Sequence, residues 1–108
     1  MTIRLLPPES GVIRNSELFQ ASGLKHAQRY ALIAADRFPP NFKLSQRASA
    51  FYRHEVSLWV DIRAAKSRLS GKDFTAWSAE LVQQLNREWG NVPQWITNCL
   101  GDDRQEVA

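Results

Sequence analysis

The chain of 108 residues has little cysteine, histidine, glycine or proline. Its one cysteine, Cys99, excludes an internal disulfide, and its distance in sequence from His26 and His54 argues against a structural zinc site. Five glycines and five prolines exclude collagen-like and proline-rich low-complexity classes. The longest aliphatic run, residues 31–35, is too short to cross a bilayer, and prolines interrupt any secretory signal within residues 1–9. We therefore expect a cytoplasmic protein.

The common signatures of catalysis are also missing from the sequence. It has no glycine-rich phosphate-binding loop and no paired histidine motif. Ser10 and Asp61 do not form a recognisable triad spacing with either histidine. We therefore expect a protein that is not an enzyme and needs neither a metal nor another cofactor.

Apolar residues make up 44% of the chain and charged residues 23%, which is typical of a globular domain with one modest core. The charge is unevenly distributed along it. Residues 1–69 carry eleven Lys and Arg against five Asp and Glu, whereas residues 70–108 carry three against six. This asymmetry suggests a polyanion-binding part with an appendage, although chance variation in surface charge would look the same.

Two short helices joined by a glycine turn are expected in the basic half. The first spans residues 17–22, with Asn15 or Ser16 as its cap and Gly23 as its stop. The second spans residues 26–36 and ends before two consecutive prolines. Its expected apolar side consists of Ala27, Tyr30, Ala31, Ile33 and Ala34. Its expected polar side consists of Gln28, Arg29, Ala35 and Asp36, with Leu32 as an apolar exception.

A small hairpin is expected next, because residues 41–44 and 50–52 have strand-forming character and flank a polar, basic stretch. Lys43 and Arg47 would lie near its tip. Helix, turn, helix and hairpin in this order predict a winged helix-turn-helix. The segment before it, residues 1–11, is expected to be an irregular arm with at most a short strand at residues 3–6.

A longer helix is expected over residues 54–69, with two apolar stripes that both require a cover. Val56, Trp59 and Val60 form one stripe, and Leu58, Ile62 and Ala65 form the other. The cover expected for the second stripe is an amphipathic helix over residues 73–89, capped by Asp73 and ended by Gly90. A short final helix over residues 93–100 would follow, with Cys99 as a buried apolar residue and frayed residues 102–108 after it.

The aromatic residues divide into two groups. Tyr30 and Trp59 lie within apolar stripes and are expected in the core. Trp77, Trp89 and Trp95 are three tryptophans in one short extension. They either cover the helix over residues 54–69 or form a surface for self-association or for another protein.

Several stretches within residues 12–68 resemble the AlpA-type phage regulatory proteins, in matching order and spacing. These stretches are Ser22-Gly23-Leu24, Tyr30, Arg37-Phe38-Pro39, Lys43-Leu44, Arg47-Ala48, Phe51-Tyr52-Arg53 and Glu55-Val56-Ser57-Leu58-Trp59. Three positions depart from the family pattern. Arg29 stands where an apolar residue is usual, Ala31 where a basic residue is frequent, and Asp36 where glycine is usual.

The resemblance implies a winged helix-turn-helix related to MerR-like and excisionase-type DNA-binding domains. We therefore expect a mainly α protein: an irregular arm at residues 1–11, a domain with a two-stranded wing at residues 12–69, and a helical C-terminal extension at residues 70–108. The candidate DNA-binding residues are the polar residues of the second helix and the basic residues of the wing and of the start of the third helix. They are Lys25, His26, Gln28, Arg29, Lys43, Arg47 and Arg53.

Each candidate has a physical reason. Lys25 and His26 would lie where a helix N-terminus approaches a phosphate. Gln28 can pair with adenine and Arg29 with guanine in the major groove. The basic residues of the wing would reach a phosphate or the minor groove, while Arg53 would either contact DNA or pair with Glu17 or Glu55.

The function expected from these observations is sequence-specific binding of double-stranded DNA in a phage or mobile element. The protein would be a transcriptional regulator or an excisionase-like architectural factor, without a membrane or small-molecule partner. The alternative is a protein-interaction adaptor that works through Trp77, Trp89 and Trp95 of the extension.

Overall fold

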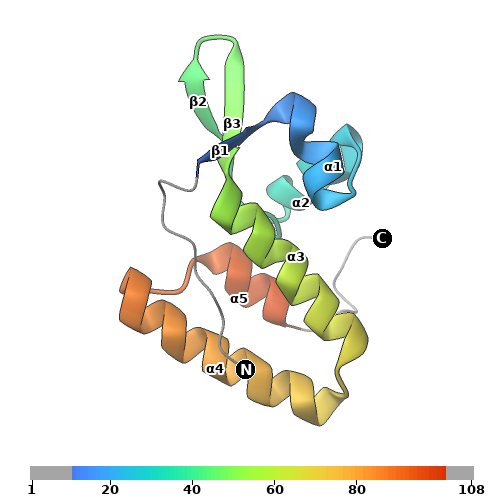
Figure 1. Ribbon diagram of the computed structural model, residues 1–108, viewed down its shortest axis with the longest axis vertical. Coiled ribbons are helices and arrows are strands. Elements are labelled where there is room, and N and C mark those ends of the chain that lie inside the picture. Colours follow the sequence, from blue (N-terminus) through green and yellow to red (C-terminus); the bar gives the residue numbers. More distant parts are fainter. Residues whose placement is uncertain (1–10, 102–108) are drawn as a thin grey trace.

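The computed structural model describes residues 11–101, so the expected strand at residues 3–6 and the expected frayed end at residues 102–108 lie outside the described residues. Helices and a small sheet alternate along the chain (Figure 1). The elements are β1 (Val12–Arg14), the 3-10 helix η2 (Asn15–Glu17), α1 (Leu18–Ser22), α2 (His26–Ala34), β2 (Phe42–Ser45), β3 (Ala48–Tyr52), α3 (Arg53–Arg68), α4 (Gly71–Trp89) and α5 (Gln94–Leu100). The fold is a mainly α winged helix-turn-helix with a helical extension, as the sequence predicts.

The sheet has three antiparallel strands in the order β1-β3-β2. The predicted hairpin is present as β2 and β3, with Gln46 and Arg47 in its turn. The strand β1, which was not predicted, pairs Val12 with Tyr52 and Arg14 with Ala50 along the other edge of β3. The two-stranded wing is therefore part of a three-stranded sheet.

The turn between α1 and α2 is the predicted glycine turn. Gly23 has a left-handed backbone, with φ of 77°, and its N–H donates to the carbonyl of Phe19 at 2.7 Å. Ser22 adds two bonds to the turn, because its hydroxyl donates to the carbonyl of Leu18 and accepts from the N–H of Leu24. Leu24 is half-buried against the core.

The second helix is shorter than expected and is rotated about its axis relative to the prediction. It ends at Ala34, and Asp36 follows with a positive φ of 57°. Its buried residues are Arg29 and Leu32, whereas the predicted apolar side contains three exposed alanines, Ala27, Ala31 and Ala34. The assignment of Arg29 to the polar face was therefore wrong. The physical reason is that alanine adds little burial energy, so one leucine outweighs several alanines in orienting a short helix.

Both predicted stripes of α3 are buried. Trp59 is 4% exposed and its Nε1 donates to the carbonyl of Arg37 at 3.0 Å, which satisfies the polar atom of a core tryptophan. Ile62 on the other stripe is fully buried. Tyr30, which was also expected in the core, is half-buried and its ring lies 4.5 Å from that of His26.

The extension covers α3 as predicted, but with two helices rather than one. Both α4 and α5 contact α3, and α5 lies between α3 and α4 in the view of Figure 1. The cap of α4 is Ser70, whose hydroxyl accepts from the N–H of Asp73, so the prediction of Asp73 as the cap was wrong. Gly90 ends α4 with φ of 81°, as expected.

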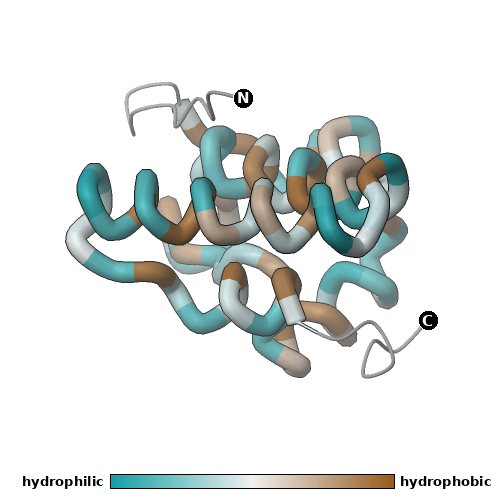
Figure 2. Tube along the Cα trace, turned by 90° about the horizontal axis from the view of Figure 1, so that it is seen from below, coloured by the Kyte–Doolittle hydropathy of each residue, from teal (hydrophilic) through white to brown (hydrophobic). Residues whose placement is uncertain are grey.

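One hydrophobic cluster runs through the helix-turn-helix and the extension. It includes Ile13 and Leu18 near the start of the described chain, and Leu81, Leu85 and Ile96 in the extension. Figure 2 shows hydrophobic and hydrophilic stretches alternating along the helices, as amphipathic helices around a shared core require. The extension is therefore packed into the same core as the helix-turn-helix.

Candidate nucleic-acid interface

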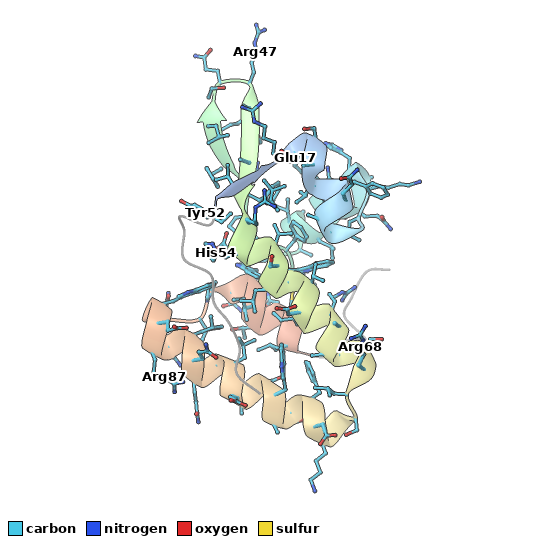
Figure 3. All side chains as sticks on the ribbon, in the orientation of Figure 1. Glu17, Arg47, Tyr52, His54, Arg68 and Arg87 are labelled. Atoms are coloured by element: carbon cyan, nitrogen blue, oxygen red, sulfur yellow. The ribbon has the colours of Figure 1, made fainter. Side chains whose placement is uncertain are left out.

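The helix-turn-helix and the hairpin lie at one end of the molecule, and α4 lies at the other (Figure 1). Arg47 extends from the hairpin tip, far from Arg68 and Arg87 at the opposite end (Figure 3). Lys43 is also exposed, on the strand that leads to the tip. The structure thus brings the predicted wing cations and the predicted second helix to the same end of the molecule.

The start of α2 presents three of the predicted residues to solvent. Lys25, His26 and Gln28 are all exposed. The side-chain oxygen of Gln28 accepts from the N–H of Lys25 at 3.1 Å, so this glutamine also caps the helix. Lys25 occupies the N-cap position, where its side chain makes no capping hydrogen bond.

Arg29 takes a different position from the one expected. It is 4% exposed, and its guanidinium donates from Nη1 to the carbonyl of Leu24 at 2.7 Å and from Nη2 to Oδ1 of Asn15 at 3.3 Å. These bonds tie α2 to the preceding turn and to η2. A guanidinium held in this way does not extend from the helix towards a base edge, so we do not retain Arg29 as a residue that reads bases.

Beside Arg29 lies an open hollow of about 340 Å³. It is lined by Asn15, Ser16, Phe19, Lys25, His26 and Arg29. The lining contains two cationic side chains and no carboxylate. Asn15, Ser16 and Phe19 were not predicted as site residues, because they lie on η2 and α1 and come beside the basic residues only in the folded chain.

Arg53 begins α3 beside β1. Its side-chain Nη2 lies 3.5 Å from the carbonyl of Val12, and its own N–H donates to the carbonyl of Gly11 at 3.0 Å. Among residues 11–101, Arg53 therefore contacts the strand rather than Glu17 or Glu55. Arg14 on β1 is another exposed cation at this end, and its position on the sheet could not be found without β1.

The loop after α2 is held by α3 and by the extension. The carbonyl of Arg37 accepts hydrogen bonds from Nε1 of Trp59 and from Sγ of Cys99, each at 3.0 Å. The side chain of Arg37 donates to the carbonyl of Asn98 at 2.9 Å. Cys99 is buried, as predicted, and burial raises the pKa of its thiol to about 11, which keeps it protonated.

Two of the three tryptophans in the extension are core residues. Trp77 is 6% exposed and Trp95 is 3% exposed, while Trp89 is half-buried with its ring 5.7 Å from that of His54. The adaptor alternative required these side chains on the surface. Trp77 and Trp95 therefore offer almost no surface to a partner, and nothing in the comparisons supports a protein partner for Trp89.

Titratable groups at the start of α3 are shifted by burial. Burial raises the pKa of Glu55 to about 7 and lowers the pKa of His54 below its ordinary value of 6.5. Within residues 11–101, no three His, Cys, Asp or Glu side chains are grouped as a metal site would require. Over the same residues, no helix combines the length and the apolar character needed to cross a membrane.

Comparison with known proteins identifies the family of this fold. Residues 11–64 match the family described as prophage CP4-57 regulatory protein (AlpA). The match contains the sheet, the helix-turn-helix and most of α3, and it excludes α4 and α5. No curated protein and no solved structure matches the chain. With half of its length matched, including every candidate DNA-binding residue, the chain belongs to the AlpA family of phage regulatory proteins.

Proposed function

We propose that the protein binds a specific site in duplex DNA and acts there as a transcriptional regulator or as an excisionase-like architectural factor of a phage or mobile element. The observation that carries this proposal is the placement of three exposed cations at one end of the molecule, with Lys25 at the N-cap of α2 and Lys43 and Arg47 on the hairpin. Family membership supports a regulatory role exerted on DNA.

In this proposal α2 enters the major groove. Gln28 is the candidate for base contact, because it is exposed and its amide can pair with adenine: the nitrogen is a free donor, and the oxygen that accepts from Lys25 has a second lone pair. Lys25 and His26 approach a phosphate beside the helix N-terminus. Arg53 adds a cation at the start of α3.

The hairpin provides the second contact. Lys43 and Arg47 would neutralise phosphates or enter the minor groove beside the major-groove site. Two contacts on adjacent grooves fix the orientation of the protein. They also help to offset the free-energy cost of bending the DNA, which is on the order of 1–6 kcal/mol for a short site. The mechanism is therefore occupancy, with or without bending, and it involves no chemical step on the DNA.

Residues 12–69 are the proposed DNA-binding domain, and residues 70–108 are a stabilising extension. A protein that acts on phage DNA in this way would work in the cytoplasm of the host. A single domain of this size gains specificity from binding as several copies on neighbouring sites.

Site selection from random duplexes with the full chain tests the proposal. The recovered sequences should share a motif, and affinity for them should fall with salt with a log–log slope of roughly −4 for about four to five neutralised phosphates. A bending assay on the recovered site then separates the architectural role from simple occupancy. If no duplex binds even at low salt, the proposal is wrong.

A further inference from the structure

The hollow beside α2 has features that the proposed base contact does not use. Arg29 is only 4% exposed, and its Nε has no hydrogen-bond partner within residues 11–101. The two acceptors of its guanidinium, the carbonyl oxygen of Leu24 and Oδ1 of Asn15, are neutral. A buried cation with neutral partners alone is costly, and a nearby anion removes that cost.

The remaining lining supplies further hydrogen-bond donors and no competing charge. Lys25 contributes an ammonium, Ser16 a hydroxyl and His26 a ring nitrogen. Because Oδ1 of Asn15 accepts from Arg29, the amide nitrogen of Asn15 remains as a donor. The hollow also adjoins the first turn of α2, a nine-residue helix whose N-cap side chain makes no capping bond.

We propose that this hollow binds one phosphodiester of the DNA backbone, with Arg29 as its buried cation and Lys25 as its exposed one. The inference rests on the proposed function, because it names the part of the duplex that the start of α2 would hold. The choice of a backbone phosphate follows from position, since the hollow opens at the end of the helix that enters the groove. Phe19 on its rim is 51% exposed and offers an apolar surface to the adjoining deoxyribose.

This assignment changes what Arg29 does. A residue that reads guanine strengthens binding to one sequence, whereas a residue that holds a phosphate strengthens binding to every sequence. Its bonds to Leu24 and Asn15 keep the guanidinium fixed before DNA arrives, so little side-chain entropy is lost on binding.

Binding of the full chain to the selected site and to a random duplex, over a range of salt concentrations, tests the site. Arg29→Met should weaken binding to both DNAs by the same factor, about tenfold, and reduce the salt slope by about 1. Arg68→Met removes an arginine of the same charge at the far end of α3 and should leave both affinities unchanged. Equal thermal stability of the variants and the wild type ensures that the comparison reports binding.

A second pair of variants keeps the test valid if Arg29→Met does not fold. Lys25→Gln changes an exposed side chain of the hollow and should reproduce the uniform loss, whereas Lys72→Gln on α4 should not. If Lys25→Gln, and Arg29→Met where it folds, bind both DNAs as the wild type does, the inference is overturned. A loss confined to the selected site overturns it as well, because that result indicates base reading.

A direct probe separates this inference from the proposed function. A dithymidine phosphodiester should shift the backbone amide resonances of His26 and Ala27 in the wild type, and Lys25→Gln should reduce the shifts. Shifts produced by inorganic phosphate but not by the diester would make this a site for a free anion and overturn the backbone assignment. A protein that takes the diester but binds no duplex retains the site and refutes the proposed function.

Discussion

Asn98 on α5 donates from its side-chain Nδ2 to the backbone carbonyl of Asp36, 2.8 Å away. Asp36 lies two residues beyond the end of α2 and is the non-glycine residue with positive φ within residues 11–101. The next residue, Arg37, returns a bond from its guanidinium to the carbonyl of Asn98. A helix outside the family match thus holds the end of the helix proposed to enter the major groove.

Replacement of Asn98 tests this connection. Asn98→Ala removes the donor to Asp36 and should lower the free energy of unfolding by about 0.5–1.5 kcal/mol, the net contribution of one hydrogen bond. It should also weaken DNA binding, since the end of α2 is then less well held. Chemical denaturation and duplex binding measure the two effects, with Thr97→Ala at an exposed neighbouring position as control. Unchanged stability in Asn98→Ala would show that the bond is not needed.

Asp36 itself provides a second prediction. A residue with a side chain loses roughly 1–2 kcal/mol of stability in the left-handed backbone conformation that Asp36 adopts. Glycine avoids this cost, but its freer unfolded chain lowers stability by about 0.5–1 kcal/mol. Asp36→Gly should therefore raise the free energy of unfolding slightly, by up to about 1 kcal/mol. Thermal unfolding measures it, and a clear drop in melting temperature would mean that the Asp36 side chain makes a needed contact.

The packing of the extension predicts the effect of a core truncation. Leu81 on α4 is fully buried within one chain, so Leu81→Ala should cost about 2–4 kcal/mol. The melting temperature should not depend on protein concentration, because this packing is intramolecular. Gln83→Ala, at an exposed position on the same helix, is the control. A concentration-dependent melt together with a dimeric mass would instead assign α4 to an interface between two chains.

The length and composition of a helix decided whether its buried face could be predicted from the sequence. The wide apolar face of α4 and the two stripes of α3 repeat over enough turns to fix both helix and orientation, and they were predicted correctly. The nine residues of α2 contain several alanines, so their periodicity could not fix which side faces inward. One usable signal was present: the family usually has an apolar residue at the position of Arg29, which is the buried position.

Features that depend on distant partners escaped the sequence analysis. Residues 12–14 are too few to show alternation, and β1 exists because they pair with β3 forty residues later in the chain. The hollow was not predicted for the same reason, since Asn15 on η2 and Phe19 on α1 line it together with residues of α2 only in the folded chain. The hairpin was predicted correctly because its two strands, its turn and its basic residues all lie within one short stretch of the sequence.

Glu55 predicts a pH dependence of stability. Burial raises its pKa from 4.5 to about 7, so the folded protein binds this proton more tightly than the unfolded chain does. The contribution of Glu55 to the free energy of unfolding is fully present below pH about 4.5 and is lost as the pH rises to about 7. Glu55→Gln should therefore be more stable than the wild type above pH about 7, with the difference shrinking as the pH falls.

The difference between wild type and Glu55→Gln isolates this group from its neighbour. Burial lowers the pKa of His54, so its contribution has the opposite sign and is lost as the pH falls. Denaturation curves over this pH range provide the measurement. A stability difference that does not change with pH would show that Glu55 keeps its ordinary pKa in the folded protein.

The hairpin cations predict a loss that is independent of sequence. Lys43→Ala and Arg47→Ala should each weaken binding to selected and random duplexes alike and lower the salt slope by about 1. Arg87→Ala, which removes a cation at the opposite end of the molecule, should leave the slope unchanged. A loss restricted to the selected site would assign the hairpin to base contact in the minor groove.

The position of β3 between two partners determines how the hairpin can move. Ala50 pairs with Arg14 on one side and with Phe42 on the other, whereas Ala48 and Ser49 pair with β2 alone. Residues 50–52 of β3 are therefore paired with β1, whereas the outer part of the hairpin, from Ser49 to the turn, is held only by the pairing of β2 with β3. Arg47 therefore lies on a part of the hairpin that is held along one edge only, so its position can adjust to a phosphate without any change in the three-stranded part of the sheet.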